Sequence, residues 1–302
     1  MTGRKTLAVI VPCHNESANI EPFYQSAKNT LDALPVDWAL IFVNDASTDD
    51  TLERILALRA GDGRVRVATL SRNFGYHSAL VAGLSSADVD LYAIVDVDGE
   101  DPPEMLAKFH TAVQKGAHTV YGIRSQRPEP RHIVFCRWLF YWINLKIADG
   151  PIKLWMAEYS MFTRVVRDHI LANKTTFPFL RAELAYVGLR MEGVPYVRQP
   201  RLRGTSHYNF WRMAQFAIGG FLASSTFPLR ASLYLSAAFA AFFLLLVPAL
   251  GLGLVEAGAL AGVLGFLFLL LTVPMLALYI ARTYKNVTAR PVFFLDPDKS
   301  RL

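Results

Sequence analysis

Two aspartates that directly follow a predicted buried strand are the residues of this sequence best suited to chemistry. Leu91–Val95 is a short apolar run rich in residues that favour β-structure, the pattern of a strand covered on both faces. Asp96 and Asp98 come next, and Gly99 allows the chain to turn. Carboxylates one residue apart can hold a hard divalent cation such as Mg²⁺ or Mn²⁺, which in turn binds a diphosphate. A solvated acidic loop is the alternative.

The residues after this pair predict how the chain leaves the strand and enters a helix. Pro102 and Pro103 end the strand, and proline is favoured in the first turn of a helix. We therefore expect a helix from Glu104 to Lys115. Acidic residues at the carboxyl end of a buried strand lie where α/β sheets bind their ligands, so the position suits a binding site.

Three further polar clusters each follow a predicted strand, at residues 7–11, 38–43 and 65–70. Strands and helices alternate, which predicts an α/β fold with a mainly parallel sheet and helices on both faces. The carboxyl ends of parallel strands share one edge, so the clusters should converge with Asp96 and Asp98 on one crevice. Four ordinary polar loops are the alternative. The clusters are Pro12–Glu16, Asn44–Asp45 and Ser71–Gly75.

The last part of the 302-residue chain contains two long apolar runs. Neither Ala231–Val255 nor Ala257–Ala281 carries a charged residue, and each is long enough to cross a bilayer, which takes about 20 residues. They predict a membrane unit at 230–282 with two transmembrane helices, at about 231–252 and 258–281. A buried helical hairpin of a soluble core is the alternative. Cations flank the unit and predict that both termini are cytoplasmic: Arg230, Arg282, Lys285 and Arg290.

Charge and aromatic residues point to the membrane surface. The formal net charge of +6 is explained by attraction to anionic lipid, since no zinc pattern, RNA-binding signature or basic tail indicates nucleic acid. Residues 131–148 and 209–229 mix aromatic and basic side chains, which predicts helices in the headgroup layer, with buried domain helices as the alternative. We therefore expect a cytoplasmic domain at 1–208 and a cytoplasmic tail at 283–302.

The polar segments, taken in order, resemble the successive motifs of family 2 glycosyltransferases. They are most similar to the polyprenyl-phosphate glycosyltransferases, the dolichol-phosphate mannose synthase-like group, over about residues 6–282. Arg201–Tyr208 resembles that group's R-x-x-G-x-S-K-Y segment, and the predicted hairpin matches its two-helix subgroup. The resemblance implies a GT-A-type, Rossmann-like fold. The other matching segments are Val11–Glu16, Asn44–Asp49, Ser71–Gly75 and Asp96–Glu104.

The resemblance also implies roles for individual residues. Asp96 would contact the nucleotide ribose or the metal, and Asp98 would ligate the Mg²⁺ or Mn²⁺ that bridges the donor diphosphate. Arg201 and Arg203 lie where the family binds the donor diphosphate or the acceptor phosphate, and the planar fork of arginine can hold two phosphate oxygens. The residues implied to bind the nucleotide-sugar are Pro12, Asn15, Glu16, Asp45 and Asn73.

Two positions depart from the family pattern. His207 stands where the family often has Lys, so a phosphate contact there would be weaker and pH-dependent. Many relatives carry Asp-Phe-Arg-Leu where this chain has Glu158–Met161. Glu158 is the counterpart of that catalytic Asp, but the missing Arg leaves it without an evident partner. An exposed acid at the start of a strand is the alternative for Glu158.

Together with the resemblance, these features predict a membrane-anchored hexosyltransferase of cell-envelope glycan biosynthesis, and the resemblance implies inversion at the anomeric carbon. It would move a sugar from a nucleotide-sugar, with a UDP-sugar favoured, to a polyprenyl phosphate such as undecaprenyl phosphate at the cytoplasmic face of the inner membrane. A phosphate monoester has a second pKa near ~6, so it is largely ionised at neutral pH and needs no strong base. Glu158 would then serve mainly to orient.

Two rival functions stay open at this point. A processive polysaccharide synthase would carry a Q-x-x-R-W motif and more membrane helices, and the sequence contains neither. A non-catalytic membrane scaffold would have no need of Asp96, Asp98 and Arg201. The identity of the sugar, the chain length of the lipid and a homo-oligomeric state are not determined by these patterns.

Overall fold

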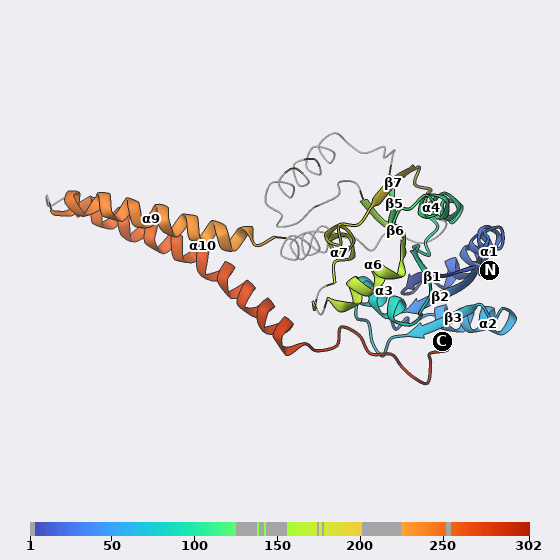
Figure 1. Cartoon of the computed structure of the whole chain (residues 1–302). Coiled ribbons are helices and arrows are strands. Elements are labelled where there is room, and N and C mark those ends of the chain that lie inside the picture. The colour runs from blue at the N-terminus through green and yellow to red at the C-terminus, as the bar shows by residue number, and fades with distance from the viewer. Residues whose placement is uncertain are drawn as a thin grey trace.

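A computed structural model describes residues 4–124, 138, 142, 156–173, 175–176, 178–200, 225–251 and 255–302. Figure 1 shows an α/β domain from which two long helices extend side by side. The strands of its seven-stranded sheet are β1 (Lys5–Cys13), β2 (Val36–Asn44), β3 (Val65–Thr69), β4 (Leu91–Ile94), β5 (Thr119–Arg124), β6 (Met156–Thr163) and β7 (Met191–Tyr196). The domain helices are α1 (Ser17–Asp32), α2 (Thr51–Gly61), α3 (Tyr76–Ser85), α4 (Met105–Gln114), α6 (Arg164–Ala172) and α7 (Leu180–Tyr186).

The sheet order is β3-β2-β1-β4-β6-β5-β7. Within this sheet β6 runs antiparallel to both β4 and β5, and the other paired strands are parallel. The predicted α/β fold with a mainly parallel sheet is therefore confirmed, but the antiparallel strand was not foreseen. The direction of a strand depends on the segments with which it pairs. An apolar run predicts a buried strand but does not specify its direction.

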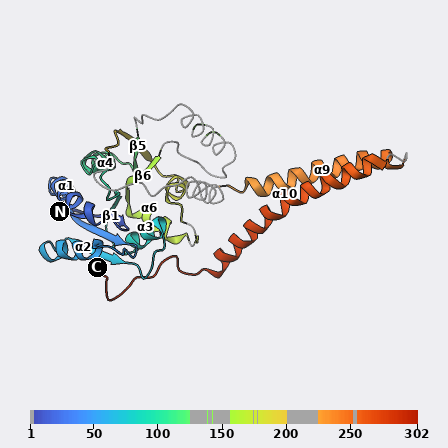
Figure 2. The ribbon, with the colours of Figure 1, turned by 180° about the vertical axis from the view of Figure 1, so that it is seen from behind.

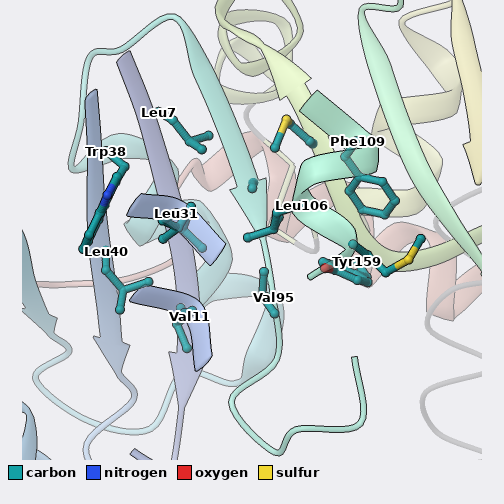
Figure 3. Packing of buried hydrophobic residues seen from close by; sticks show 14 of the residues in the cluster. Leu7, Val11, Leu31, Trp38, Leu40, Val95, Leu106, Phe109 and Tyr159 are labelled. Carbon is teal, nitrogen blue, oxygen red and sulfur yellow. The ribbon is translucent and has the colours of Figure 1, made fainter. Parts of the chain in front are cut away.

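Side chains from alternate positions of the strands pack on opposite faces of the sheet. In β1, Leu7, Val9 and Val11 belong to one buried cluster, while Ala8 and Ile10 belong to the other. The first cluster contains side chains of α1, α2 and α4, and the second those of α3, α6 and α7. Figure 3 shows part of the first layer, where Leu106 and Phe109 of α4 lie near Tyr159 of β6. Helices thus cover both faces, which explains why the strands are apolar throughout.

α3 packs unusually closely against the strands beneath it. A Cβ added at Gly83 would lie 2.3 Å from Cγ2 of Ile10 and 2.8 Å from Cγ2 of Val43. The absence of a side chain therefore allows the helix to lie directly on β1 and β2. This contact fixes the position of the helix whose first residue, Tyr76, enters the candidate site.

The long helices are α9 (Phe227–Gly251) and α10 (Val255–Thr288), which run side by side away from the domain (Figures 1 and 2). The rings of Phe239 and Phe268 stack between them with centroids 4.7 Å apart. Among the residues that the structure describes, one segment, Ala261–Thr288, is long and apolar enough to cross a membrane, with a mean hydropathy of 2.5; the apolar part of α9, Leu229–Leu245, is shorter. The second membrane span therefore stays a prediction.

The apolar side chains of α10 are largely exposed. Leu270 and Leu271 are 58% and 61% exposed, and Ile280 is 68% exposed. Helices in the core of a soluble domain bury such side chains. The alternative of a buried hairpin in a soluble core is therefore wrong.

The C-terminal segment does not extend away from the domain. The backbone N–H of Asp296 donates to the carbonyl oxygen of Thr69 at 2.8 Å, and Arg301 exchanges backbone hydrogen bonds with Val67. Residues 294–301 therefore pair along the outer edge of β3, which would otherwise be an open sheet edge. The predicted tail thus includes a segment of ordered structure on the α/β domain.

The two predicted surface helices fall mostly outside the described residues. Trp138 and Trp142 are described; both are helical and about half exposed, and their rings lie 6.3 Å apart. Of residues 209–229, the structure describes 225–229, which lead into α9.

Candidate active site

The carboxyl ends of β1 to β4 meet at one edge, as their parallel pairing requires. The backbone N–H of Asp45 donates to Cys13, that of Leu70 to Asn44, and that of Val95 to Ile10, at 2.9, 2.9 and 3.1 Å. The four polar segments that follow these strands are therefore neighbours. The convergence expected from the sequence is present in the structure.

Asp45 organises the loop that follows β3. It is 4% exposed, and its two carboxylate oxygens accept hydrogen bonds from the backbone N–H groups of Phe74 and Gly75, at 2.7 and 2.8 Å. Gly75 has φ +89°, a left-handed conformation that favours glycine. The carboxylate therefore holds this loop and determines where the neighbouring Asn73 lies.

An exposed polar surface lies between the first and third loops. Nδ1 of His14 lies 2.8 Å from the carbonyl oxygen of Asp45, which can only accept, so Nδ1 is the donor and Nε2 the acceptor of the neutral ring. Nε2 in turn lies 3.2 Å from Nδ2 of Asn73 and 3.5 Å from Nδ2 of Asn15. Asn15 has φ +57°, and its Oδ1 accepts from the backbone N–H of Thr48 at 2.8 Å. The site thus includes His14, which sequence reasoning did not select.

Pro12 and Glu16, the two other residues implied to bind the nucleotide, contact the neighbouring elements β2, α1 and α2. Pro12 is buried within β1, where it pairs with Val43. Glu16 accepts a hydrogen bond from Nδ2 of Asn19 at 2.6 Å, and its backbone N–H donates to Oγ1 of Thr51 at 2.9 Å. These contacts tie the starts of α1 and α2 together at the edge of the crevice.

Asp96 lies among other carboxylates. The hydroxyl of Tyr76, at the start of α3, donates to its Oδ1 at 2.8 Å. Burial raises the pKa of Asp96 to about 7, and the charges of Asp101 and Asp98 add to this shift. A cation placed beside Asp96 would therefore stabilise the ionised form of its carboxylate.

Asp98 follows on the same turn and is 8% exposed. Its Oδ1 accepts from the backbone N–H of Glu100 at 3.1 Å, and Gly99 between them has φ +75°. The chain therefore turns directly after Asp98 instead of continuing the strand.

Asp101 is the most deeply buried acid of this turn, at 1% exposed. It accepts a hydrogen bond from the hydroxyl of Tyr196 and pairs with Nη2 of Arg124 at 3.4 Å, while Nε of Arg124 donates to the same hydroxyl at 3.0 Å. Burial raises the pKa of Asp101, and these two partners oppose the shift. Arg124 and Tyr196 face each other across the β5–β7 pair. Sequence reasoning missed this triad because its members come from three distant segments.

Glu158 lies in β6 and is 7% exposed, so the alternative of an exposed acid is wrong. Nε of Arg181, on α7, donates to its Oε1 at 2.7 Å. Arg181 therefore supplies the cationic partner that the local sequence lacks. The other oxygen, Oε2, is buried and has no hydrogen-bond partner within the described part of the chain. Such an atom is costly to bury and suits a ligand.

The strand β7 leads the chain back to the Asp98 turn. Arg198 pairs with the carboxylate of Glu100, and the backbone N–H of Gln199 donates to the carbonyl oxygen of Glu100 at 2.9 Å. The next predicted site residues, Arg201, Arg203 and His207, lie outside the described residues.

The acidic pair fits a divalent cation that substrate phosphates complete. Within the described ranges, no group of three or more His, Cys, Asp or Glu side chains is arranged to hold a metal ion. Asp101 is engaged by Tyr196 and Arg124, and Asp96 and Asp98 are the acids that directly follow β4. Mg²⁺ is commonly held by one or two carboxylates together with substrate phosphates, and a cation would oppose the burial and the neighbouring charges that raise the pKa of Asp96.

Comparison with known proteins identifies the family of this chain. The family model described as glycosyl transferase family 2 matches residues 8–171. A bactoprenol glucosyl transferase of Shigella phage SfV is 30% identical, over 98% of this chain and 99% of its own. An uncharacterized glycosyltransferase of Synechocystis is 28% identical, over 96% of this chain and 94% of its own.

A solved structure supports the fold. The glucosyl-3-phosphoglycerate synthase of Mycobacterium tuberculosis, in complex with phosphoglyceric acid, superposes with a TM-score of 0.51 at 20% identity, over 72% of this chain and 79% of that chain. The domain is therefore α/β and GT-A-like. With a family match over more than half of the sequence and full-length relatives named bactoprenol glucosyl transferase, the chain belongs to glycosyl transferase family 2.

Proposed function

We propose that this protein transfers a hexose from a nucleotide-sugar, a UDP-sugar in the favoured case, to a polyprenyl phosphate. The observation that carries the proposal is the turn after β4, where Asp96 and the buried Asp98 lie close enough for their charges to interact. At the same edge of the sheet, His14 lies beside Asn15 and Asn73. The full-length relatives named bactoprenol glucosyl transferase support this acceptor and make glucose the first sugar to test.

The donor would lie across the carboxyl edge of the sheet. Its nucleoside would contact the polar surface of His14, Asn15 and Asn73, whose amide groups offer both donors and acceptors. Its diphosphate would lie near Asp96 and Asp98, whose carboxylates would hold Mg²⁺ or Mn²⁺ together with the diphosphate. The cation, when bound, neutralises the charge that develops on the leaving diphosphate.

The acceptor would approach from the side of Glu158 and of the segment after β7. An oxygen of the acceptor phosphate attacks the anomeric carbon, the bond from that carbon to the diphosphate oxygen breaks, and the nucleoside diphosphate leaves with inversion. Because the acceptor phosphate is already ionised, no side chain has to remove a proton. Glu158, held by Arg181, would position the acceptor. Arg201 and Arg203, with His207 beside them, would bind its phosphate.

We propose further that α9 and α10 both cross the inner membrane, with both termini and the catalytic domain in the cytoplasm. The exposed apolar side chains of α10 and the cations at its C-terminal end support this arrangement. Reporter fusions at residue 1 and after Leu302 should both report the cytoplasm. A C-terminus on the opposite side from the N-terminus would mean that a single helix spans.

The transfer itself is tested with purified full-length protein, undecaprenyl phosphate, Mg²⁺ and a panel of radiolabelled nucleotide-sugars. We expect label in the extracted lipid with one nucleotide-sugar, UDP-glucose being the first candidate. Metal-dependent binding of a nucleotide-sugar without label in any lipid would refute the acceptor. Absence of any nucleotide-sugar binding would favour the scaffold function.

A further inference from the structure

A cavity of about 840 Å³ lies between the loop after β3 and the C-terminal end of α10. Neither Asp96 nor Asp98 lines it. Its walls come from Arg72, Phe74, Ser78 and Thr176, from the last turns of α10 and from the segment that follows. In Figures 1 and 2, α10 ends beside the domain and the C-terminal segment runs back beneath it. The cavity is thus located where the long apolar helix meets the catalytic domain.

Three cations line this cavity: Arg72, Lys285 and Arg290. No Asp or Glu occurs among its described lining residues. The guanidinium of Arg72 lies over the ring of Phe74, 3.9 Å from the centroid, which holds its charge in place. The electrostatic character of the cavity therefore favours an anion.

The remaining wall is apolar and continues into the helix. Ile280 and Tyr284 line the cavity and are 68% and 69% exposed, and both belong to the segment Ala261–Thr288 that could cross a membrane. An occupant could therefore place an anionic head among the cations and an apolar chain along α10. This is the chemistry of a lipid at the membrane surface.

Both sides of the cavity are held by hydrogen bonds. Oδ1 of Asn286, on α10, accepts from the backbone N–H and the hydroxyl of Thr176, at 3.1 and 2.7 Å. On the other side, the carbonyl oxygen of Phe294 accepts from the backbone N–H of Ser71 at 2.9 Å, and the Phe294 ring lies 6.3 Å from that of Phe74. The cavity is therefore built before any ligand arrives.

We propose that this cavity binds the phosphate headgroup of an anionic phospholipid of the bilayer, with an acyl chain along α10. The proposal rests on the membrane insertion of α10 suggested above, but not on the transfer reaction. A phospholipid is favoured over the polyprenyl acceptor because the lining of the cavity includes neither Asp96, Asp98 nor Glu158, the described residues at which the proposed transfer would occur. The bound lipid would fix the loop that carries Asn73 against the membrane surface.

The test is native mass spectrometry of the full-length protein in neutral detergent, titrated with phosphatidylglycerol. Removing two cations that face an anionic headgroup should weaken binding by about tenfold to thirtyfold, so Lys285→Ala/Arg290→Ala should retain far less lipid. The matched control is Lys108→Ala/Lys115→Ala, which removes two exposed cations from the region of α4 and should bind normally. Equal retention by both double variants would overturn the proposal.

A second variant separates a cavity from diffuse attraction. Ala281→Trp keeps every charge and fills the space between the cations and the helix, so it should also lose lipid. Normal binding by Ala281→Trp would mean that the cations attract lipid without a built site, and would overturn the proposal. Parallel titrations with undecaprenyl phosphate and inorganic phosphate identify the source of the anion. Displacement of phosphatidylglycerol by either one would assign the cavity to the acceptor or to a free anion instead.

The result is independent of the proposed reaction. Lipid binding that depends on Lys285 and Arg290 in a protein that transfers no sugar would retain the cavity and reject the enzyme. Transfer activity in a protein whose two double variants bind lipid equally would retain the enzyme and reject the cavity.

Discussion

Oε1 of Glu158 accepts a hydrogen bond from Nε of Arg181 at 2.7 Å, and this pair joins the antiparallel strand β6 to α7 beside the candidate site. The carboxylate is buried and Arg181 is about one-third exposed. Removing the cation leaves a buried carboxylate without its partner, which is more costly than losing a surface ion pair.

Arg181→Ala should therefore lower the free energy of unfolding by about 2–3 kcal/mol, the lower range for a buried ion pair because Arg181 is partly exposed. Thermal and urea unfolding in detergent measure the change. Arg164→Ala, which removes a cation paired with the exposed Asp88, is the control and should cost less than about 1 kcal/mol. Adding Glu158→Gln to Arg181→Ala should recover part of the loss. If Arg181→Ala and Arg164→Ala are equally stable, the Glu158–Arg181 pair does not stabilise the packing of α7.

Asp98→Asn should preserve the fold and reduce transfer by about two orders of magnitude or more, because a neutral amide is a poor ligand for a hard cation. EDTA should have the same effect on the unaltered protein, reversed by Mg²⁺ or Mn²⁺. Asp88→Asn, which alters an exposed acid, is the matched control. Full activity of Asp98→Asn in the presence of EDTA would contradict the metal assignment.

Asp45→Ala should raise KM for the nucleotide-sugar more than it lowers kcat. It removes two hydrogen bonds that hold Phe74 and Gly75, and charged-acceptor bonds of this kind are worth about 1.5–3 kcal/mol, or at least about tenfold in affinity. Asn73 would then lose its position beside His14. Steady-state kinetics with the donor varied measure the two constants. An unchanged KM would show that the loop does not bind the donor.

Because of the buried His77, the free energy of unfolding should decrease as the pH falls. Burial lowers the pKa of His77, an effect that Arg181 assists and Glu158 opposes. The unfolded state therefore binds a proton that the folded state excludes, and stability falls as the pH drops below about 6.5. His77→Gln should flatten the dependence of the melting temperature on pH between about 5 and 7. Identical pH profiles for the two proteins would exclude this contribution.

Arg201→Lys should retain membrane association and lose at least about tenfold in transfer, since a bidentate charge-assisted contact is worth about 1.5–3 kcal/mol. Lysine keeps the charge but cannot present two parallel donors. Near-normal transfer by this variant, with loss only on charge reversal to Glu, would indicate that Arg201 belongs to a solvated basic rim. Membrane flotation and the lipid-extraction assay provide the two measurements.

The local sequence by itself predicted the strand and the turn that carry Asp96 and Asp98. The apolar run before Asp96, the turn at Gly99 and the prolines after Asp101 are short-range patterns, and such patterns specify a buried strand and its end without tertiary information. Because parallel strands share their carboxyl edge, the order of elements also predicted that the segments carrying Asp96, Asn15 and Asn73 lie at one edge of the sheet. The family resemblance added expected roles to residues already found.

Only the tertiary structure decided how those residues are held. Arg181 reaches Glu158 because β6 runs antiparallel, and Tyr196 reaches Asp101 because β7 pairs with β5; neither pairing is encoded in a local period. The backbone pairing of Arg301 with Val67 is likewise not encoded locally, because the two residues lie far apart in the sequence. Contacts of such large sequence separation depend on which surfaces are complementary once the sheet has formed, so they cannot be read from spacing along the sequence.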